Sequence, residues 1–318
     1  MEYRKLIKFG NSSHIISLPN SWIRKNKLKK GALIYFEENG NGEIILAPKE
    51  INNKILDKEI TIDITGKEIN EVRRELSTAY INNYRIINVV GKDLNANSGN
   101  IKNSLRNFMA MEIMEQTSKN ITAKDFLDMN SISIDEIIRK IDIIVRALMA
   151  DSKKTPYENN YDNIYQRDED VNRLSFLIFR ITKFALNNLQ TLKNFNITPV
   201  GLLGYWQLTN HLEKIADEVK RVSRFVTKAK LRGKRASEFV ALYSKIESYY
   251  LETIKVYYNK NKESAIHSTM KKVMYINFCD DYLNKYGDSR WVPNLIERFK
   301  IMINEIHSIL KIVYEVYE

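Results

Sequence analysis

Two carboxylates four residues apart, Glu213 and Asp217, have the spacing in this sequence that best suits metal chemistry. Residues four apart on an α-helix lie on one face, so both carboxylates could reach one cation. Carboxylate oxygens are ordinary ligands of divalent metals. The same spacing also suits a surface charge ladder, in which Asp217 pairs with Arg221 and no metal is bound. Spacing alone leaves both interpretations open.

Cations near the N-terminus form a second candidate site. The first 50 residues contain nine basic side chains against five acidic ones. Arg4, Lys5 and Lys8 precede a polar turn that includes Asn11 and Ser13. Such cations suit contacts with phosphates, and the amide and hydroxyl groups could reach base edges or the nucleic-acid backbone. The alternative is a set of solvated strand residues.

A run of cations between positions 220 and 235 contains no acidic residue. It could hold DNA phosphates, an anionic ligand or an acidic partner. The alternative is the solvated end of a helix, because the helix dipole favours cations near a C-terminus. Both interpretations stay open. The eight cations are Lys220, Arg221, Arg224, Lys228, Lys230, Arg232, Lys234 and Arg235.

No group of residues typical of an enzyme is present in the sequence. The four histidines are scattered, and no G-x-S-x-G, H-E-x-x-H, G-x-G-x-x-G or Walker motif occurs. The one cysteine, Cys279, excludes an internal disulfide and a thiolate zinc site, and it suits a reducing compartment. We therefore expect a protein that is not an enzyme.

Composition indicates which elements position these residues. The chain has 318 residues, 44% of them hydrophobic and 28% charged, with only 11 Gly and 5 Pro, so long helices with short connections are expected. The formal net charge of +11 fits contact with a polyanion. The chain shows no signal peptide and no apolar run long enough to cross a membrane, which predicts a cytoplasmic protein without membrane insertion.

The first 50 residues contain short β-rich segments separated by turn residues, unlike the rest of the chain, and predict a small β domain. So few residues in short strands bury little surface, so association with a second copy is a reasonable way to complete the core. The expected elements are strands at 3–9, 14–18, 32–38 and 43–47, a short helix at 19–27 and a hairpin turn at 39–42.

Hydrophobic periodicity predicts an α/β connector over 51–127 and a helical region over 128–318. In the connector we expect a strand, a helix and a strand, at 58–64, 68–82 and 85–90. A loop at 91–100, a short helix at 101–108 and two strands within 111–123 follow. In the helical region we expect helices at 133–151, 160–190, 199–229, 235–259, 261–284 and 291–317, which would make two three-helix units.

The segment YRKLIKFGNSSHIISLPNSWIRKNKLKKG resembles the AbrB/MazE/SpoVT swapped-hairpin DNA-binding domain. Its anchors are the Phe-Gly-Asn-Ser turn and the Leu-Pro step, and Ala32 departs from the Asp that commonly follows the glycine. The resemblance implies that two chains interleave into one barrel whose basic first strands face double-stranded DNA. The contacts it implies are Arg4, Lys5, Lys8, Asn11, Ser13, His14 and Arg24.

Residues 111–230 resemble the archaeal form of the PhoU phosphate-uptake regulator, through MEIMEQTSKNITAKDFLD, RDEDVNRLSFLIFRITKFAL and HLEKIADEV. PhoU proteins have two three-helix repeats and hold iron or zinc on E/D-x-x-x-D strings, which Glu213 and Asp217 match. The acidic string at 168–172 ends in Asn172, and Ile301 stands where the second repeat would carry an Asp. At most one metal site, rather than a multinuclear cluster, is therefore expected.

Together these observations predict a multidomain, mainly α protein with a swapped-hairpin β domain, an α/β connector and a PhoU-like pair of three-helix bundles. The expected function is that of a homodimeric DNA-binding transcriptional regulator of phosphate uptake. One alternative is a signalling adaptor that binds a phosphate transporter or a kinase through the helical bundle. Another is an architectural protein that binds DNA with little sequence preference.

Overall fold

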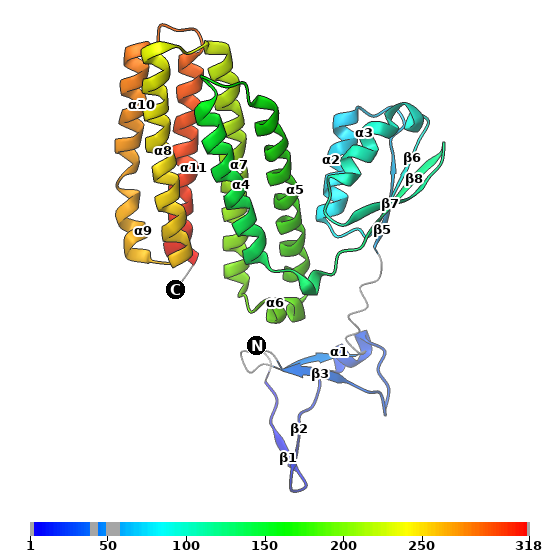
Figure 1. Cartoon of the computed structure of the whole chain (residues 1–318). Coiled ribbons are helices and arrows are strands. Elements are labelled where there is room, and N and C mark those ends of the chain that lie inside the picture. Colours follow the sequence, from blue (N-terminus) through cyan, green and yellow to red (C-terminus); the bar gives the residue numbers. More distant parts are fainter. Residues whose placement is uncertain (1–2, 39–43, 49–57, 317–318) are drawn as a thin grey trace. The chain divides into compact units, whose positions relative to one another are not determined.

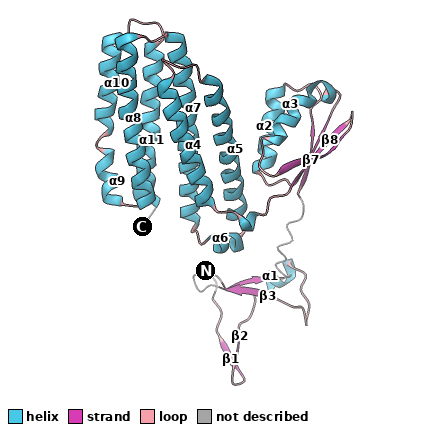
Figure 2. Ribbon diagram, in the orientation of Figure 1, coloured by secondary structure: helices cyan, strands magenta, loops and turns pink. Residues whose placement is uncertain are grey.

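The computed structural model describes residues 3–38, 44–48 and 58–316 (Figure 1). The chain divides into two compact units, Met1–Leu56 and Asp57–Glu318. Helices predominate in the second unit, and short strands predominate in the first (Figure 2). The predicted multidomain, mainly α class is therefore confirmed.

The N-terminal unit consists of two antiparallel strand pairs and one short helix. Its elements are β1 (Ile7–Phe9), β2 (Ser13–Ile15), α1 (Asn20–Lys25), β3 (Tyr35–Glu38) and β4 (Ile44–Ala47). Strand β1 pairs with β2, and β3 pairs with β4. The strands are shorter than predicted, and the hairpin turn expected at 39–42 lies outside the described residues.

A four-stranded sheet with two helices opens the second unit. Its strand order is β5-β6-β8-β7, with β5 parallel to β6 and the other neighbours antiparallel. Alternate residues of β6 and β8 are buried, so one face of the sheet packs against the apolar sides of α2 and α3. The elements are β5 (Glu59–Asp63), α2 (Ile69–Ile81), β6 (Ile86–Val90), α3 (Leu94–Arg106), β7 (Met111–Gln116) and β8 (Asn120–Asp125).

Two groups of helices follow and share one hydrophobic core. Helices α4, α5 and α7 pack together, as do α8, α10 and α11, and the packing of α7 against α11 joins the two groups (Figure 1). After the short 3-10 turn at Met129–Ser131, the helices are α4 (Ile134–Lys154), α5 (Tyr161–Leu186), α6 (Leu189–Phe195), α7 (Pro199–Ala229), α8 (Gly233–Asn259), α9 (Lys262–Thr269), α10 (Lys272–Tyr286) and α11 (Val292–Val316).

Three predicted boundaries are wrong. The sequence predicts a loop at 91–100, but α3 begins at Leu94 because its apolar side chains are buried against the sheet. The helix expected over 160–190 ends at Leu186, and α6 follows after two asparagines. The helix expected over 261–284 is interrupted at Met270 and Lys271, where backbone N–H groups donate to carbonyls three residues earlier.

Local side chains account for several helix ends. Thr198 caps α7, since its hydroxyl accepts a hydrogen bond from the backbone N–H of Gly201 at 3.0 Å, and Pro199 occupies the first helical position. Helix α7 ends at Ala229, and the residue that follows it, Lys230, has a left-handed φ of 48°. Glycine is the usual residue in that conformation, because other residues have a Cβ that crowds the backbone there.

We call the four-stranded sheet with α2 and α3 the sheet module. A buried ion pair connects the sheet module to the helices that follow it. Arg180 of α5 and Asp125 at the end of β8 are each 1% exposed, and their side chains meet at 2.6 Å. The guanidinium also stacks 4.5 Å from the centre of the Tyr80 ring and donates to the side chain of Asn83 at 3.1 Å. The planar Arg180 side chain thus connects α5 with both α2 and the sheet.

Candidate nucleic-acid interface and candidate metal site

The β1–β2 hairpin has a polar face, which carries the Lys8 cation, and an apolar face. In its register Lys8 lies opposite His14, and Ile7 lies opposite Ile15. Directly opposite residues of an antiparallel pair point to the same side, and successive residues alternate between sides. Lys8 and His14 therefore share one face of the hairpin. Ile7, Phe9 and Ile15 share the other face, together with Ser13, which lies opposite Phe9.

All seven predicted DNA contacts are exposed side chains of the N-terminal unit. The hairpin brings Lys8 and His14 together, places Asn11 in its turn and places Ser13 at the start of β2. Arg24 is on a separate element, in the last turn of α1. Arg4 and Lys5 lie just before β1. Six of the seven side chains therefore come from residues 4–14, and only Arg24 comes from elsewhere in the unit. The exposed set is Arg4, Lys5, Lys8, Asn11, Ser13, His14 and Arg24.

The N-terminal unit has no buried side chain among its described residues. Its large apolar side chains face solvent instead, and Phe9 is 64% exposed while Phe36 is 73% exposed. An apolar surface of this kind in so small a unit is typical of an interface, because exposing it to water costs free energy. The other apolar residues that are at least two-fifths exposed there are Tyr3, Leu6, Ile7, Ile15, Ile16, Leu33 and Ile44.

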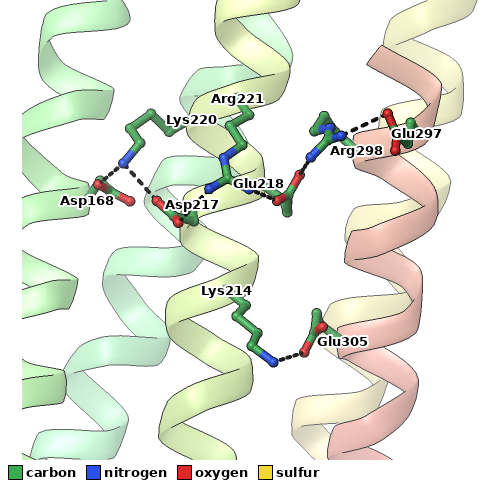
Figure 3. A network of polar contacts seen from close by, with 9 residues as sticks. All are labelled: Asp168, Lys214, Asp217, Glu218, Lys220, Arg221, Glu297, Arg298 and Glu305. Carbon is green, nitrogen blue, oxygen red and sulfur yellow. Dashed lines mark hydrogen bonds and ion pairs between the residues drawn. The ribbon is translucent and has the colours of Figure 1, made fainter. Parts of the chain in front are cut away.

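The predicted metal ligands Glu213 and Asp217 lie on α7, one turn apart. Figure 3 shows Asp217 next to two cations of the same helix. Asp217 forms ion pairs with Lys220 at 2.8 Å and with Arg221 at 3.2 Å. The ammonium of Lys220 also forms an ion pair with Asp168 of α5, which is 1% exposed. The charge ladder that is the alternative to a metal is therefore present, and Lys220 lies between the two aspartates.

Burial and neighbouring charges change the pKa of Lys220 in opposite directions, whereas at Glu213 burial and the nearby aspartates change the pKa in the same direction. Burial lowers the pKa of Lys220, but hydrogen bonds to Asp168 and Asp217 outweigh that effect and raise its pKa overall. Lys220 is therefore a permanent cation at neutral pH. Burial, with the nearby charges of Asp217 and Asp168, raises the pKa of Glu213. Among the described residues, Glu213 has no ion-pair partner.

The ion pairs continue from α7 to α11 (Figure 3). Arg221 also pairs with Glu218, and Glu218 lies 3.5 Å from Arg298 of α11. One turn closer to the N-terminus of α7, Lys214 lies 3.8 Å from Glu305 of α11. Within the described part of the chain, no three or more His, Cys, Asp or Glu side chains are arranged to hold a metal ion. The metal site at Glu213 and Asp217 stays a prediction.

Some partners could not be identified from sequence spacing. Lys220 is one cation of a basic run, yet its buried partner Asp168 comes 52 residues earlier. Arg180 and Asp125, 55 residues apart, carry no sequence signal either. Helical periodicity is the one sequence signal that could have helped. It could have placed Asp168 and Arg180 on the buried side of α5, where a charge needs a partner of opposite sign.

Comparison with known proteins identifies one part of the chain. Residues 7–54 match the family model described as antidote-toxin recognition MazE, bacterial antitoxin. No curated protein and no solved structure matches the chain. The match supports the AbrB/MazE-type assignment of the N-terminal unit, a type found in DNA-binding regulators and antitoxins. It does not extend to the sheet module or the helices, so it gives no support to a PhoU relationship or an archaeal origin. None of the described helices is long and apolar enough to cross a membrane.

Proposed function

We propose that this protein is a homodimeric DNA-binding transcriptional regulator that contacts double-stranded DNA through its N-terminal unit. The observation that carries the proposal is the two-faced β1–β2 hairpin. Its polar face holds Lys8 and His14, and its apolar face holds Ile7, Phe9 and Ile15. The Lys8 cation on the polar face suits a phosphate, while the apolar face suits burial against a second chain.

Dimerisation and DNA contact support one another in this arrangement. Pairing two copies would bury the apolar faces and present two sets of cations, as a symmetric operator requires. Asn11, in the hairpin turn, is a short polar side chain that could reach base edges. Ser13 lies opposite Phe9, on the apolar face. We assign the cations to phosphate contact and Asn11 to sequence reading.

The test is binding of the full chain to duplex DNA from its own upstream region and to a shuffled duplex, across a salt series. The double variant Arg4→Ala/Lys8→Ala is expected to weaken binding to both duplexes and to lower the salt dependence by about 0.9 for each phosphate that is no longer neutralised. Lys29→Ala/Lys30→Ala is the matched control, since it removes two exposed cations of the same unit. Equal binding by parent and Arg4/Lys8 variant would contradict the proposal.

For the helical part we propose a non-enzymatic role as a sensor or partner-binding domain in phosphate uptake. The support is the resemblance of residues 111–230 to PhoU proteins. Phosphate status, or a bound transporter or kinase, would then alter DNA affinity. Titration of the protein–DNA complex with inorganic phosphate tests the sensor role. Capture of a phosphate transporter by a chain that lacks residues 1–50 would favour the adaptor alternative, and equal affinity for native and shuffled duplexes would favour the architectural one.

An antitoxin is the second candidate, and the name of the matching family model favours it. An antitoxin holds a toxin in a stoichiometric complex. Purification of the chain at its native level, followed by mass measurement of the intact complex, distinguishes the two functions. A second, different polypeptide at constant stoichiometry would favour the antitoxin, whereas a mass of two identical chains would favour the regulator.

A further inference from the structure

One end of the helical bundle collects exposed cations from three connections between helices. The α4–α5, α7–α8 and α10–α11 connections lie together at the end of the bundle opposite α6 (Figure 1). We call their cations the basic end. It consists of the exposed residues Lys154, Lys228, Lys230, Arg232, Lys234 and Arg290.

Contacts between the three connections place these cations side by side. The Lys228 ammonium lies 4.7 Å from the centre of the Trp291 ring, and the Arg290 guanidinium carbon lies 4.9 Å from the same ring. Lys230 and Arg232 line a hollow of about 390 Å³ together with residues 155–159 of the α4–α5 connection. The basic end is thus one continuous surface, built from segments more than 50 residues apart.

Among the described residues, two exposed acids lie on this surface: Glu158 lines the same hollow as Lys230 and Arg232, and Asp288 of the α10–α11 connection pairs with Arg235. The cations of the basic end nevertheless outnumber them. Elsewhere in the same run, Lys220 and Arg221 are paired with buried or half-buried acids. In contrast, Lys228, Lys230 and Arg232 have no acidic partner within the described part of the chain, and neither does Arg290. Lys234 is 79% exposed and reaches Glu238 only at 4.0 Å.

Helix stability explains the positions of only some of these cations. The positions of Lys228 and Lys230 at the C-terminus of α7 do suit the helix dipole. Arg232 and Lys234, however, flank the first residue of α8, and Arg290 comes just before α11. Neither helix has an acidic residue in its first turn. A cation at a helix N-terminus opposes the helix dipole, so the fold alone would favour acids there.

The composition of this surface fits a nucleic acid better than a folded protein. Interfaces between proteins have an apolar centre that is depleted in charge. The described residues of the three connections lack an exposed apolar centre of this kind. Tyr157 is 64% exposed, but Leu231 is buried, and the Trp291 ring is covered by the cations of Lys228 and Arg290. Interfaces with DNA are polar and rich in cations, because phosphates supply most of the attraction.

We propose that the basic end binds the phosphate backbone of double-stranded DNA, as a second contact in addition to the N-terminal unit. The inference rests on the proposed function, since the N-terminal unit would choose the sequence. Lysine dominates the basic end, and its flexible point charge suits phosphates more than base edges. The second contact therefore adds affinity without sequence preference.

The test compares two variants of the full chain that carry the same change in net charge. One is Lys228→Gln/Lys230→Gln/Arg232→Gln/Lys234→Gln. The control is Lys140→Gln/Lys255→Gln/Lys262→Gln/Lys311→Gln, which removes exposed lysines of α4, α8, α9 and α11. The basic-end variant is expected to bind native and shuffled duplexes more weakly by the same factor. Its salt slope is expected to fall by about 0.9 for each phosphate that the variant leaves unneutralised, while the control follows the parent.

A second measurement uses the unaltered chain and does not depend on the folding of a variant. Acetylation of lysine side chains is followed by mass spectrometry with and without duplex. Protection of Lys228, Lys230 and Lys234, without protection of Lys140 and Lys255, supports the inference. Equal acetylation at both sets overturns it, as does identical binding by the two variants.

The outcomes separate this inference from the proposed function. Binding that is abolished in Arg4→Ala/Lys8→Ala but kept in the basic-end variant overturns only the second contact. Failure of the parent chain to bind either duplex overturns both. An acidic protein that protects the basic-end lysines, where duplex DNA does not, would overturn the assignment to DNA.

Discussion

At the scale of single residues, Lys220 determines what the acidic side chains of α7 can do. Its ammonium pairs with Asp168 and Asp217, so both carboxylates have a permanent counter-charge. Removing one member of a buried ion pair is costly, because it leaves the other charge in a poor dielectric environment. Glu213 differs from these carboxylates, since it is half-buried and no cation of the described residues forms an ion pair with it.

This difference predicts opposite effects for Glu213→Gln and Asp217→Asn. Burial, Asp217 and Asp168 raise the pKa of Glu213 in the folded state, so the folded state binds more protons than the unfolded one. The contribution of Glu213 to stability is therefore full below its unfolded pKa and is lost as the pH rises through the folded pKa. At pH 7, Glu213→Gln is expected to raise the free energy of unfolding by up to about 1 kcal/mol, since solvent screens the group.

Urea unfolding of the two variants across a pH series measures the effect. The gain in Glu213→Gln should vanish below about pH 3, well below the unfolded pKa of about 4.3, where the carboxyl is protonated in both states. Asp217→Asn loses ion pairs with Lys220 and Arg221 and should lose about 1 kcal/mol at pH 7. If the two residues instead bind iron or zinc, adding that metal should raise the melting temperature of the parent chain and of neither variant.

At the scale of elements, the close approach of α7 and α11 depends on a glycine. A Cβ added at Gly204 would lie 2.7 Å from Cγ1 of Val316, which is closer than two carbons can pack. Gly204→Ala should therefore separate the two helices and destabilise the chain by about 1–3 kcal/mol. Gly99→Ala in α3 is the control, because a Cβ there meets nothing within 4 Å. That change should stabilise by about 0.4–1 kcal/mol.

Chemical denaturation of both glycine variants would separate packing from helix propensity. If Gly204→Ala were as stable as Gly99→Ala, α7 and α11 would have to pack more loosely than the structure shows. An increase in the slope with denaturant would point to a changed denatured state instead. Because the packing of α7 against α11 joins the two groups of helices, loss of cooperativity in Gly204→Ala would show that the groups can unfold separately.

Elements with a regular apolar period could be predicted from the sequence, and the others could not. The helix expected over 199–229 is present, since Pro199, its cap and a regular stripe agree. In α3, only Leu94, Ile101 and Leu105 are buried, and Asn, Ser and Gly between them resemble a loop. Packing against the sheet decides that case. The candidate hairpin was predictable because its turn and strands are local in sequence, whereas the partners of Lys220 and Arg180 are distant.

At the scale of the whole molecule, the described residues of the N-terminal unit form no buried core of their own. Its described residues include no buried side chain, although Asp57–Glu318 has extended hydrophobic cores. A small β unit with its apolar side chains in water would be unstable alone, because burial of such side chains is the main favourable term in folding. We therefore expect the oligomeric state to depend on these residues rather than on the helices.

The double variant Ile7→Ser/Phe9→Ser tests this expectation, because both side chains lie on the apolar face of the hairpin. Full burial of a large apolar side chain contributes about 1.5–3 kcal/mol, and a dimer would lose each contribution twice. The dissociation constant should rise by at least about 1,000-fold. Sedimentation equilibrium should then show a dimer for the parent and a monomer for the variant at the same concentration.

The control for dimerisation is Met270→Ser/Val273→Ser, which removes two side chains of the second unit that are 78% and 67% exposed. We expect this variant to remain a dimer and to bind DNA as the parent does. Dissociation of the control, with an intact dimer in Ile7→Ser/Phe9→Ser, would instead place the interface on the α9–α10 surface. DNA affinity should fall in step with dimerisation only if two hairpins must bind one duplex.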